Sequence, residues 1–550
     1  MRITPMKATA GIAASALAVT LTACTSGGGG EAASGEIDME SQVGYMENFD
    51  VGTTFKATEP VEFGLLYRDH PDYPFRADWS VVQHLEQDHN VTFDYVNVPL
   101  ADLQTRRSVL ISSGEAPDIM PSIYAGEERQ FVSGGALLPI SDYVEHMPNF
   151  LDKIERWGLE AEIENLRQAD GKYYLLPGIH EIAKPQYSIA IRKDLWEKAG
   201  LTEDPATWDE FATQLEAVKQ ANPELEYAFS DKWSINSPME QTLNAAAPNF
   251  GTLAGVGLNG GGLWWDEEAG EFSYAPASDG YRELVTYFAG LVEAGLMDPE
   301  SVTQQMETGE QKFASGSVAA ISSNDQELVK YRANFEQTGN TEAEVHQIVV
   351  PAGPYGSYLA PGSRRESGIV FAASAAEQDD FLAMLQFVDW LYYSDEGLEF
   401  AKWGVEGETY TKDASGKRTL MEDIDVNGLN PGAPKELRKD FGYHNGVWML
   451  AHGSTEDLDK SMLREEVIAF LDGMNEKEEL PLPPAIAYDE MQQEQAGLLQ
   501  TNLLDIVNQN TAAFIVGDRP LSEWDAYVAE LEGAGMQDYV DLANSTLEQE

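Results

Sequence analysis

The sequence predicts a mixed α/β fold built around a parallel, doubly wound sheet. Strand-like and helix-like segments alternate near its start, which is the order that βαβ units give. The strand-like runs lie at 61–67, 91–98 and 117–123, and the helix-like runs at 79–87 and 100–112. The chain has 550 residues, of which 43% are hydrophobic and 26 are proline, so it can bury large cores. This length allows two or three domains of about 100 to 200 residues each.

Local spacing predicts the individual elements. The run 61–67 is apolar and ends before a turn with two prolines, and Asp78 can cap the helix that follows it. Val81, Val82 and Leu85 then share one helix face, whereas 91–98 alternates like a strand. Later segments also show helical periodicity, and one between them is strand-like. The helices are expected at 194–200, 208–220, 281–294, 377–393 and 522–532, and the strand at 317–322.

The charge of the chain excludes one class of partner. Lysine and arginine number 35 and aspartate and glutamate 93, so the formal net charge is 35 − 93 = −58. Binding to a phosphate backbone needs clustered cations, and we therefore expect no nucleic-acid partner. The excess of acid predicts a well-solvated surface that resists aggregation.

The N-terminus reads as a lipoprotein signal. Arg2 and Lys7 precede an apolar run at 8–21 that is too short to span a bilayer. The run ends in Leu-Thr-Ala-Cys at 21–24, which resembles a bacterial lipobox. We expect residues 1–23 to be removed and Cys24 to carry acyl chains such as palmitate; ordinary secretory cleavage leaving a free thiol is the alternative.

The segment after Cys24 predicts a tether. Residues 24–57 are rich in glycine, serine and acid and have little to bury. Cys24 is the single cysteine, which excludes an intrachain disulfide and a multi-cysteine metal site. No later run reaches about 18 uncharged apolar residues, so we expect a domain held on the outer face of a membrane by its lipid alone.

Motifs for catalysis or cofactors are weak. The motifs H-E-x-x-H, G-x-S-x-G and G-x-x-x-x-G-K-[ST] do not occur. Residues 255–260 have dinucleotide-fingerprint spacing, but the glycines and tryptophans that follow cannot open a helix. Residues 423–428 match half of a calcium loop, yet Pro434 stands where a bidentate glutamate is required, which favours a solvated turn. We expect no catalytic residue, no cofactor and no metal.

Aromatic residues give the positive indication. The chain has 11 tryptophans and 23 tyrosines, several of them in polar or glycine-rich surroundings. A sugar-binding cleft needs flat apolar rings beside groups that hydrogen-bond hydroxyls. For each ring alone, packing in a core or an interface is the favoured explanation, but the set favours carbohydrate.

Several segments, in order, resemble extracellular solute-binding lipoproteins of ABC importers, the family-1 sugar type and its long oligosaccharide-binding subgroup. SGEAPDIM at 113–120 resembles the family's SGDAPDI, and DGKYYLLP at 170–177 resembles its strand before the hinge. IRKDLWEKAGL at 191–201, with PATWDEF at 205–211, is similar to the entry into the second lobe. SDEGLEFAKWGVEGETY at 394–410 is similar to a motif of the long subgroup.

The resemblance implies a two-lobe, type II periplasmic-binding-protein-like fold with the ligand in a cleft between lobes joined by crossing hinges. An N-terminal lobe would hold 58–178 and 318–368, and a C-terminal lobe 179–317 and 369–550. The hinges would lie at 176–189, 317–322 and 368–373.

The resemblance also implies that the protein binds and delivers a ligand and catalyses no reaction. The protein would be a monomer that captures an extracellular carbohydrate, expected to be an oligosaccharide, by cleft closure and delivers it to membrane permease subunits. The candidate ligand-binding residues are stacking rings and hydroxyl acceptors. They are Tyr124, Trp264, Trp265, Trp403, Glu406 and Asp118, followed by Trp79, Trp233 and Trp448. Glu406 could instead be a turn residue.

Two alternatives stay open. The same fold could bind peptides or anionic sugars. Anionic ligands would need cations in the cleft. The arginines available for this are Arg68, Arg76, Arg192, Arg364 and Arg365. The second alternative is a surface glycoside hydrolase or lyase, because 93 acids always provide some carboxylate pair at a suitable distance.

Overall fold

The first sheet is formed mainly by the N-terminal part of the chain. The computed structural model describes residues 37–449 and 453–547; Cys24 and the expected signal peptide lie outside the described residues. This sheet has five strands in the order β2-β1-β3-β12-β4. Its strands are β1 (Val61–Asp69), β2 (Val91–Pro99), β3 (Ile119–Ile123), β4 (Leu176–Ile179) and β12 (Arg365–Phe371). β1 pairs in parallel with β2 and β3, whereas β12 is antiparallel to β3 and β4.

The βαβ alternation predicted for 61–123 is confirmed. Helix α1 (Ser80–His89) joins β1 to β2, and α2 (Leu103–Ser113) joins β2 to β3. The expected cap of α1 is wrong: Trp79 stands at the N-cap without a side-chain hydrogen bond. Asp78 instead accepts from the guanidinium of Arg76 at 2.8 Å, a bidentate pair that competes with capping.

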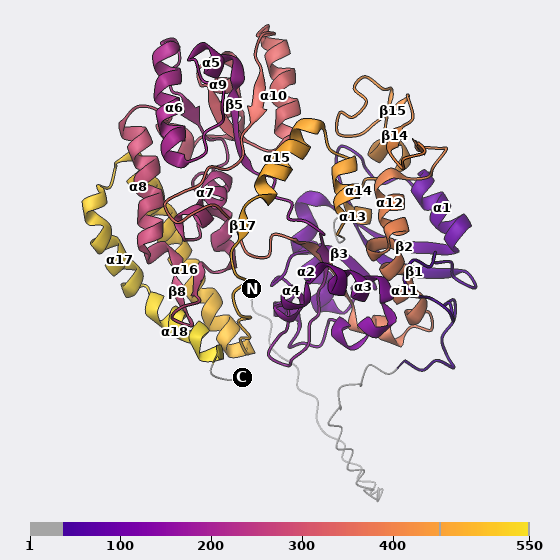
Figure 1. Cartoon of the computed structure of the whole chain (residues 1–550). Coiled ribbons are helices and arrows are strands. Elements are labelled where there is room, and N and C mark those ends of the chain that lie inside the picture. The colour runs from indigo at the N-terminus through magenta and orange to yellow at the C-terminus, as the bar shows by residue number, and fades with distance from the viewer. Residues whose placement is uncertain (1–36, 450–452, 548–550) are drawn as a thin grey trace, which may run out of the picture. The chain divides into compact units, whose positions relative to one another are not determined.

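The second sheet has four strands in the order β10-β5-β9-β6. They are β5 (Ser188–Arg192), β6 (Phe229–Ser230), β9 (Ala320–Ser323) and β10 (Val345–Gln347). Helices α5 (Lys193–Lys198), α6 (Trp208–Ala221) and α8 (Asp279–Glu293) follow the predicted segments within a few residues. Figure 1 shows the two sheets with their helices in different parts of the molecule.

Strand pairing divides the chain differently from the sequence-based boundaries. β9, expected to return to the first lobe, pairs antiparallel with β5 and parallel with β6. Its four side chains are all buried, as in a central strand. Helix α11 (Phe381–Tyr393), expected in the second lobe, packs in the first core. Which sheet a short apolar strand joins depends on long-range pairing, which local sequence does not encode.

The chain passes between the sheets through segments that connect these strands. It first crosses through residues 180–187, between β4 and β5. It returns through 348–364, between β10 and β12, and crosses again at 462–464, between α14 (Glu456–Ser461) and α15 (Glu465–Asn475). Both cores belong to one compact unit that begins at Ile37.

The first core is organised around α11, whose thirteen residues are all buried. Buried Asp389 on this helix accepts from the backbone N–H groups of Asn149 at 2.9 Å and Phe150 at 2.8 Å. These donors lie in the first turn of α3 (Pro148–Trp157), so the carboxylate satisfies groups that a helix leaves unpaired at its start. Neighbouring helices are α4 (Glu160–Glu164), α12 (Asp395–Trp403) and α13 (Gly446–Met449).

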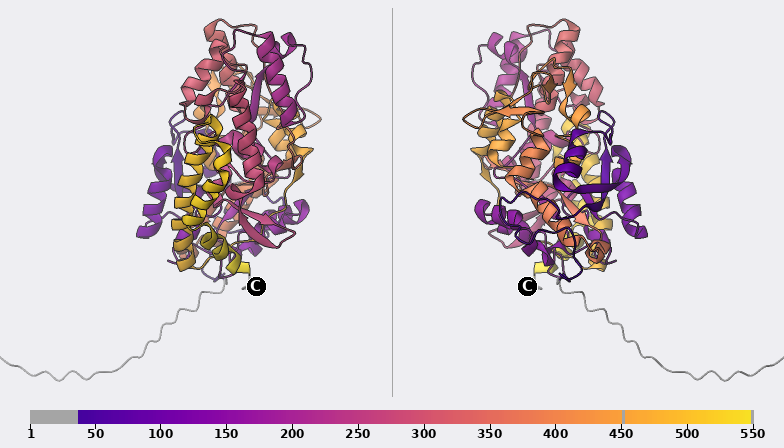
Figure 2. Two further views of the ribbon diagram at one scale, coloured as in Figure 1. Left: turned by 90° about the vertical axis from the view of Figure 1, so that its left-hand side faces the viewer. Right: turned by 90° about the vertical axis from the view of Figure 1, so that its right-hand side faces the viewer.

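The second core is closed by the C-terminal helices. Helix α16 (Glu490–Val516) runs beside α8, and α17 (Trp524–Gly533) and α18 (Met536–Leu547) pack with it (Figure 2). The remaining helices on this side are α7 (Glu240–Ala246), α9 (Met306–Ser315) and α10 (Asp325–Thr338). Among the described residues, no helix combines the length and apolar character needed to cross a membrane.

Short strand pairs complete the structure. They are β7 (Leu263–Asp266) with β8 (Glu271–Tyr274), β11 (Tyr358–Leu359) with β17 (Glu478–Glu479), β13 (Tyr410–Lys412) with β14 (Arg418–Leu420), and β15 (Ile424–Asp425) with β16 (Lys435–Glu436).

Candidate functional site

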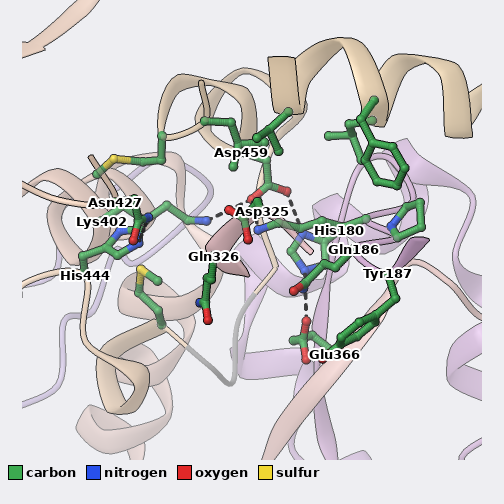
Figure 3. A pocket seen from close by; sticks show the side chains of 18 of the residues that line it. His180, Gln186, Tyr187, Asp325, Gln326, Glu366, Lys402, Asn427, His444 and Asp459 are labelled. Atoms are coloured by element: carbon green, nitrogen blue, oxygen red, sulfur yellow. Dashed lines mark hydrogen bonds and ion pairs between the residues drawn. The ribbon is translucent and has the colours of Figure 1, made fainter. Parts of the chain in front are cut away.

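A pocket of about 490 Å³ lies among the segments that connect the two sheets. Tyr124, which follows β3, and Glu366 on β12 line it from the first sheet. Residues 184–187 of the first crossing segment and Gln347 on β10 line it from the second. Figure 3 shows Gln186, Tyr187 and Glu366 among the side chains that line it. A pocket with walls from both sheets changes shape when they move relative to each other.

A second pocket of about 520 Å³ continues the first. The two share Asp325 and Gln326 at the start of α10, Asn427, and the apolar side chains Met462, Leu463 and Val467. The second extends to His70 and Tyr73, whose rings stack with centroids 4.1 Å apart. The shared lining makes the two pockets neighbours, and we call them together the cleft.

Tyr124 is presented by a strained turn. Ser122 at the end of β3 has φ +66°, which directs the chain out of the sheet. Buried Arg107 donates to the carbonyl oxygen of Ser122 at 2.7 Å and to Glu127 at 2.6 Å. Glu127 also accepts from the backbone N–H of Tyr124. The turn is therefore fixed, and Tyr124 is left 55% exposed.

The start of α10 is anchored by a cap and a buried ion cluster. The side chain of Asn324 accepts from the N–H of Glu327 at 3.0 Å, so Asp325 and Gln326 occupy the first turn, facing the cleft. The ammonium of Lys232, which is fully buried, donates to Glu310 at 2.9 Å and also pairs with Glu327. This pairing compensates the buried charge and fixes the helix.

One carboxylate organises the charged wall of the cleft. Asp459 accepts from Nδ1 of His180 at 2.7 Å, from Nζ of Lys184 at 3.0 Å and from Nζ of Lys402 at 3.1 Å. Burial opposes its charge, but these cations hold the pKa of Asp459 well below its usual range. Because Asp459 stays ionised, it is unsuited to donate a proton. It instead joins α14, α12 and the first crossing segment.

The histidine opposite this cluster is neutral. Burial, reinforced by nearby cations such as Arg438 and Lys402, holds the pKa of His444 well below its usual range. Its Nε2 lies 3.2 Å from the side-chain nitrogen of Asn427, which donates to it. Neutral imidazole and amide groups hydrogen-bond hydroxyls without adding charge to the cleft.

Comparison with known proteins identifies the family. The model described as "Bacterial extracellular solute-binding protein" matches residues 73–397, more than half of the chain. The chain belongs to this family. The predicted resemblance and the predicted α/β, type II binding-protein fold are thereby confirmed.

Two curated relatives match most of this solute-binding protein. The fructooligosaccharide ABC transporter substrate-binding protein FusA of Streptococcus pneumoniae is 23% identical over 533 residues, 90% of this chain and 92% of the relative. The polygalacturonan/rhamnogalacturonan-binding protein YtcQ of Bacillus subtilis is 22% identical over 490 residues, which cover 86% of this chain and 87% of the relative. The crystal structure of alginate-binding protein AlgQ2 without calcium ion has the same fold, with TM-score 0.65 and 17% identity over 90% of this chain and 99% of that one.

Of the nine predicted ligand-binding residues, Tyr124 lines the cleft of this solute-binding protein. Trp233 lies one layer behind: it is buried, and its ring meets the edge of the cleft residue Tyr187 at 5.3 Å between centroids. It therefore positions another ring.

Three predicted tryptophans are buried in the first core and do not line the cleft. They are Trp79, Trp403 and Trp448. Trp403 is 2% exposed, packs on Tyr410 and donates from Nε1 to Ser461 at 3.0 Å. The indole of Trp79 donates to the carbonyl oxygen of Lys439. Asp118 is also structural, because its carboxylate accepts from the N–H of Gly64 at 2.8 Å within the first sheet.

The other predicted residues line separate pockets. Trp264 and Trp265 on β7 are half-buried beside Tyr355 in a pocket of about 480 Å³ whose lining residues differ from those of the cleft. Glu406 is exposed and borders a third pocket with Glu399 and Arg418. The structure does not bring these residues together with Tyr124.

The polar cleft residues escaped sequence-based prediction because they come from distant parts of the chain. They are His180, Lys184, Tyr187, Lys402, Asn427, His444 and Asp459. Tyr187 carried a usable signal, since it lies in the predicted hinge 176–189. Lys402 precedes Trp403, which drew attention instead.

The weak motifs have structural explanations. Residues 255–260 form a short 3-10 helix that leads into β7, the reverse of a strand-to-helix phosphate loop. Asp425 accepts from the N–H of Asn430 at 2.8 Å and so closes a turn. Within residues 37–449 and 453–547 there is no group of three or more His, Cys, Asp or Glu that could hold a metal ion.

Proposed function

We propose that this solute-binding protein captures an extracellular oligosaccharide in the cleft and delivers it to the permease of an ABC importer. The observation that carries this proposal is that two neighbouring pockets share six lining residues, because an extended ligand of several units needs more room than a single pocket gives. Sugar binding by the relatives FusA and YtcQ supports the same ligand class.

The cleft has the groups that such a ligand requires. Rings of Tyr124, Tyr187 and Tyr73 offer flat apolar surface for the C–H faces of sugars. Gln186, Gln326 and Asn427 offer amides that replace water at the hydroxyls. The lining thus combines stacking surface with polar partners along its whole length.

Closure supplies the signal for delivery. The crossing segments 180–187, 348–364 and 462–464 allow the two sheets to move as units around the ligand. A ligand that contacts both walls binds the closed form more tightly and shifts the population toward it. No bond is made or broken, and the surface created by closure is what the permease reads.

The membrane attachment is proposed from sequence. The lipobox-like Leu-Thr-Ala-Cys at 21–24 supports acylation of Cys24, and the glycine-rich composition that follows supports a flexible leash. The leash is shorter than the expected 24–57, because Phe55 and Ala57 are buried in the first core. The protein acts as a monomer on the outer face of the cytoplasmic membrane, because a closing cleft requires free lobes.

A thermal-shift screen tests the proposal on the protein from Glu36 onward. The panel contains neutral oligosaccharides, uronic-acid oligosaccharides, monosaccharides and short peptides. A ligand at 100 times its dissociation constant adds about 2.7 kcal/mol and raises Tm by several degrees. We expect a shift with one oligosaccharide series and recovery of the sugar intact. A shift with peptides alone, or a cleaved sugar, would contradict the proposal.

A further inference from the structure

His180 has a buried ring nitrogen that no described residue satisfies. The residue is 4% exposed and lines the first pocket, and its Nδ1 lies 2.7 Å from Asp459. Because Asp459 stays ionised, it accepts this hydrogen bond; Nδ1 therefore carries the hydrogen, and Nε2 offers a lone pair in this tautomer. Nε2 has no hydrogen-bond partner within the described part of the chain. A buried polar atom without a partner costs free energy, which a donor brought into the pocket recovers.

Glu366 lies beside this nitrogen. Its Oε2 is 4.0 Å from Nε2 of His180, too far for a direct hydrogen bond, and Figure 3 shows the imidazole between Asp459 and Glu366. The backbone N–H of Ser367 donates to Oε1 of Glu366 at 3.2 Å. The register of β12 against β4 shifts between Glu366 and Ile369, an irregularity that re-aims side chains. Two acceptors therefore line the first pocket side by side.

The carboxylate of Glu366 is also close to the two tyrosines of the first pocket. Burial raises the pKa of Tyr124, and the charge of Glu366 is the next cause of the rise. Burial raises the pKa of Tyr187 as well; Asn324 lowers it in part, and Glu366 adds to the rise. Tyr124 follows β3 and Tyr187 precedes β5, so the rings come from the two walls of the pocket. A sugar stacked against these rings has its hydroxyl edge within reach of the acceptors.

The charges of the first pocket disfavour an anionic ligand. Its lining contains three carboxylates and two ammonium groups, which belong to Asp325, Glu366, Asp459, Lys184 and Lys402. Both lysines donate to Asp459, and among the described residues no lysine or arginine forms an ion pair with Glu366 or Asp325. None of the five arginines considered for an anionic ligand lines either pocket. A ligand carboxylate would meet like charge here, whereas a hydroxyl can donate to these groups.

We propose that Glu366 and Nε2 of His180 together bind two adjacent hydroxyls of one sugar unit beside Tyr124 and Tyr187, so that the preferred ligand is a neutral oligosaccharide with a free vicinal diol. Each hydroxyl donates to one acceptor, and the buried Nε2 thereby gains the donor that the protein does not supply. The bond to the charged carboxylate is the stronger of the two, so Glu366 dominates the selectivity. This inference rests on the proposed oligosaccharide-binding function and names the class of sugar.

Calorimetric titration with matched ligands tests the inference. The probes are neutral oligomers of glucose, galactose and mannose, three to five units long and linked so that each unit keeps two adjacent free hydroxyls. Each is compared with an acidic counterpart, whose units carry a carboxylate on the exocyclic carbon, and with a deoxy counterpart, whose units lack one hydroxyl of the pair. We expect the wild type to bind one neutral series about tenfold or more tightly than either counterpart.

Two variants of Glu366 separate its charge from its hydrogen bond. Glu366→Gln removes the charge and should bring the affinities for the neutral and acidic oligomers together. Glu366→Ala removes the acceptor and should remove most of the difference between the neutral and deoxy oligomers, because the missing hydroxyl then has no partner to lose. Glu62→Gln is the matched control: exposed Glu62 lies on β1 of the same sheet and lines neither pocket, so both preferences should persist.

The outcomes distinguish the inference from the proposed function. Tighter or equal binding of the acidic series by the wild type would overturn the inference and leave the proposed function standing. The same holds if Glu366→Gln weakens both members of a neutral and acidic pair equally, or if the deoxy change costs as much in Glu366→Ala as in the wild type. Binding of no oligosaccharide from any series would overturn both. A circular-dichroism melting curve confirms that each variant is folded.

Discussion

Nδ1 of His180 lies 2.7 Å from a carboxylate oxygen of Asp459, which ties helix α14 to the segment through which the chain leaves the first sheet. The same carboxylate accepts from Lys184 on that segment and from Lys402 on α12. One acidic side chain thus fixes the root of a crossing segment beside the cleft. The predictions below begin from this cluster.

Replacing Asp459 should destabilise the fold. Asp459→Asn leaves the buried ammonium of Lys402 and the partly buried ammonium of Lys184 without this counter-charge, and removing one member of such a cluster costs about 3 to 5 kcal/mol. The free energy of unfolding from urea titration measures this loss. Asp457→Asn on the same helix is the control, because Asp457 forms an exposed pair with Arg418 and should cost less than about 1 kcal/mol. Equal losses in the two variants would contradict the role of Asp459.

Tyr124→Ala should weaken ligand binding by about tenfold, because it removes the ring that the turn after β3 holds in the cleft. Tyr355→Ala is a close control: Tyr355 is 54% exposed, against 55% for Tyr124, but it lines the separate pocket beside Trp264. Titration of both variants with the oligosaccharide found in the screen compares them. A larger loss in Tyr355→Ala would place the ligand in that other pocket.

Trp403→Ala should affect stability. Removing this buried ring leaves a cavity in the first core and costs about 3 to 5 kcal/mol. Trp403→Phe retains much of the packing and should remain folded with unchanged ligand affinity. Trp264→Ala, which truncates a half-buried ring, should cost less than Trp403→Ala. If folded Trp403→Phe lost most of its ligand affinity, Trp403 would belong to the binding site after all.

The stability of the protein should carry a pH dependence from Asp389. Burial raises the pKa of Asp389 to about 7, although Asn149 and Phe150 donate to it. In the unfolded chain an aspartate loses its proton near pH 4. Between about pH 4 and 7 the folded state therefore binds more protons, and this group makes stability fall as pH rises, by up to about 4 kcal/mol.

The contribution of Asp389 to the pH dependence is measured by comparing the wild type with a variant that lacks this carboxyl group. The free energy of unfolding of the wild type minus that of Asp389→Asn should decrease from pH 4 to pH 7, because the variant no longer titrates at this position. Asp94→Asn, at an exposed position on β2, should show no such change. A difference that stays constant or increases with pH would contradict the raised pKa.

Cys24→Ser should release the protein from the membrane. Without a thiol the acyl chains cannot be attached, and nothing else in the expected tether holds the chain to a bilayer. Fractionation of cells expressing each form, with radiolabelled palmitate, measures the change. The wild type should be labelled and membrane-bound, whereas the variant should be unlabelled and released. A labelled or membrane-bound variant would contradict lipidation at Cys24.

The fold could be predicted from sequence further than the site. Alternating patterns placed β1 to β3 and most of the expected helices correctly, because each pattern depends on local periodicity. Membership of β9 in the second sheet was not predictable in this way, since it depends on pairing with β5 more than a hundred residues earlier. The 27-residue helix α16 was missed, and its apolar residues are spread around it without a single clear face.

Fewer residues of the site than of the fold could be predicted from sequence. Trp403 stands in a polar, glycine-containing stretch typical of a surface, yet Ser461 and Tyr410 enclose it. Tyr124 stands in a similar stretch and is exposed. The difference between them comes from tertiary packing, and the polar cleft residues likewise converge from the crossing segment after β4, from α12 and from α14 only in the folded chain. Residue type suggested the ligand class, whereas position within the cleft required the structure.

The measurement that tests the central claim most directly is ligand affinity as a function of oligosaccharide length. Calorimetric titration with one sugar series, from the monosaccharide to the hexasaccharide, reports how many units the two contiguous pockets hold. We predict that the dissociation constant falls steadily over the first three or more units and then levels off as the cleft is filled. An affinity that is already maximal for the monosaccharide would contradict the account of the cleft as an oligosaccharide site.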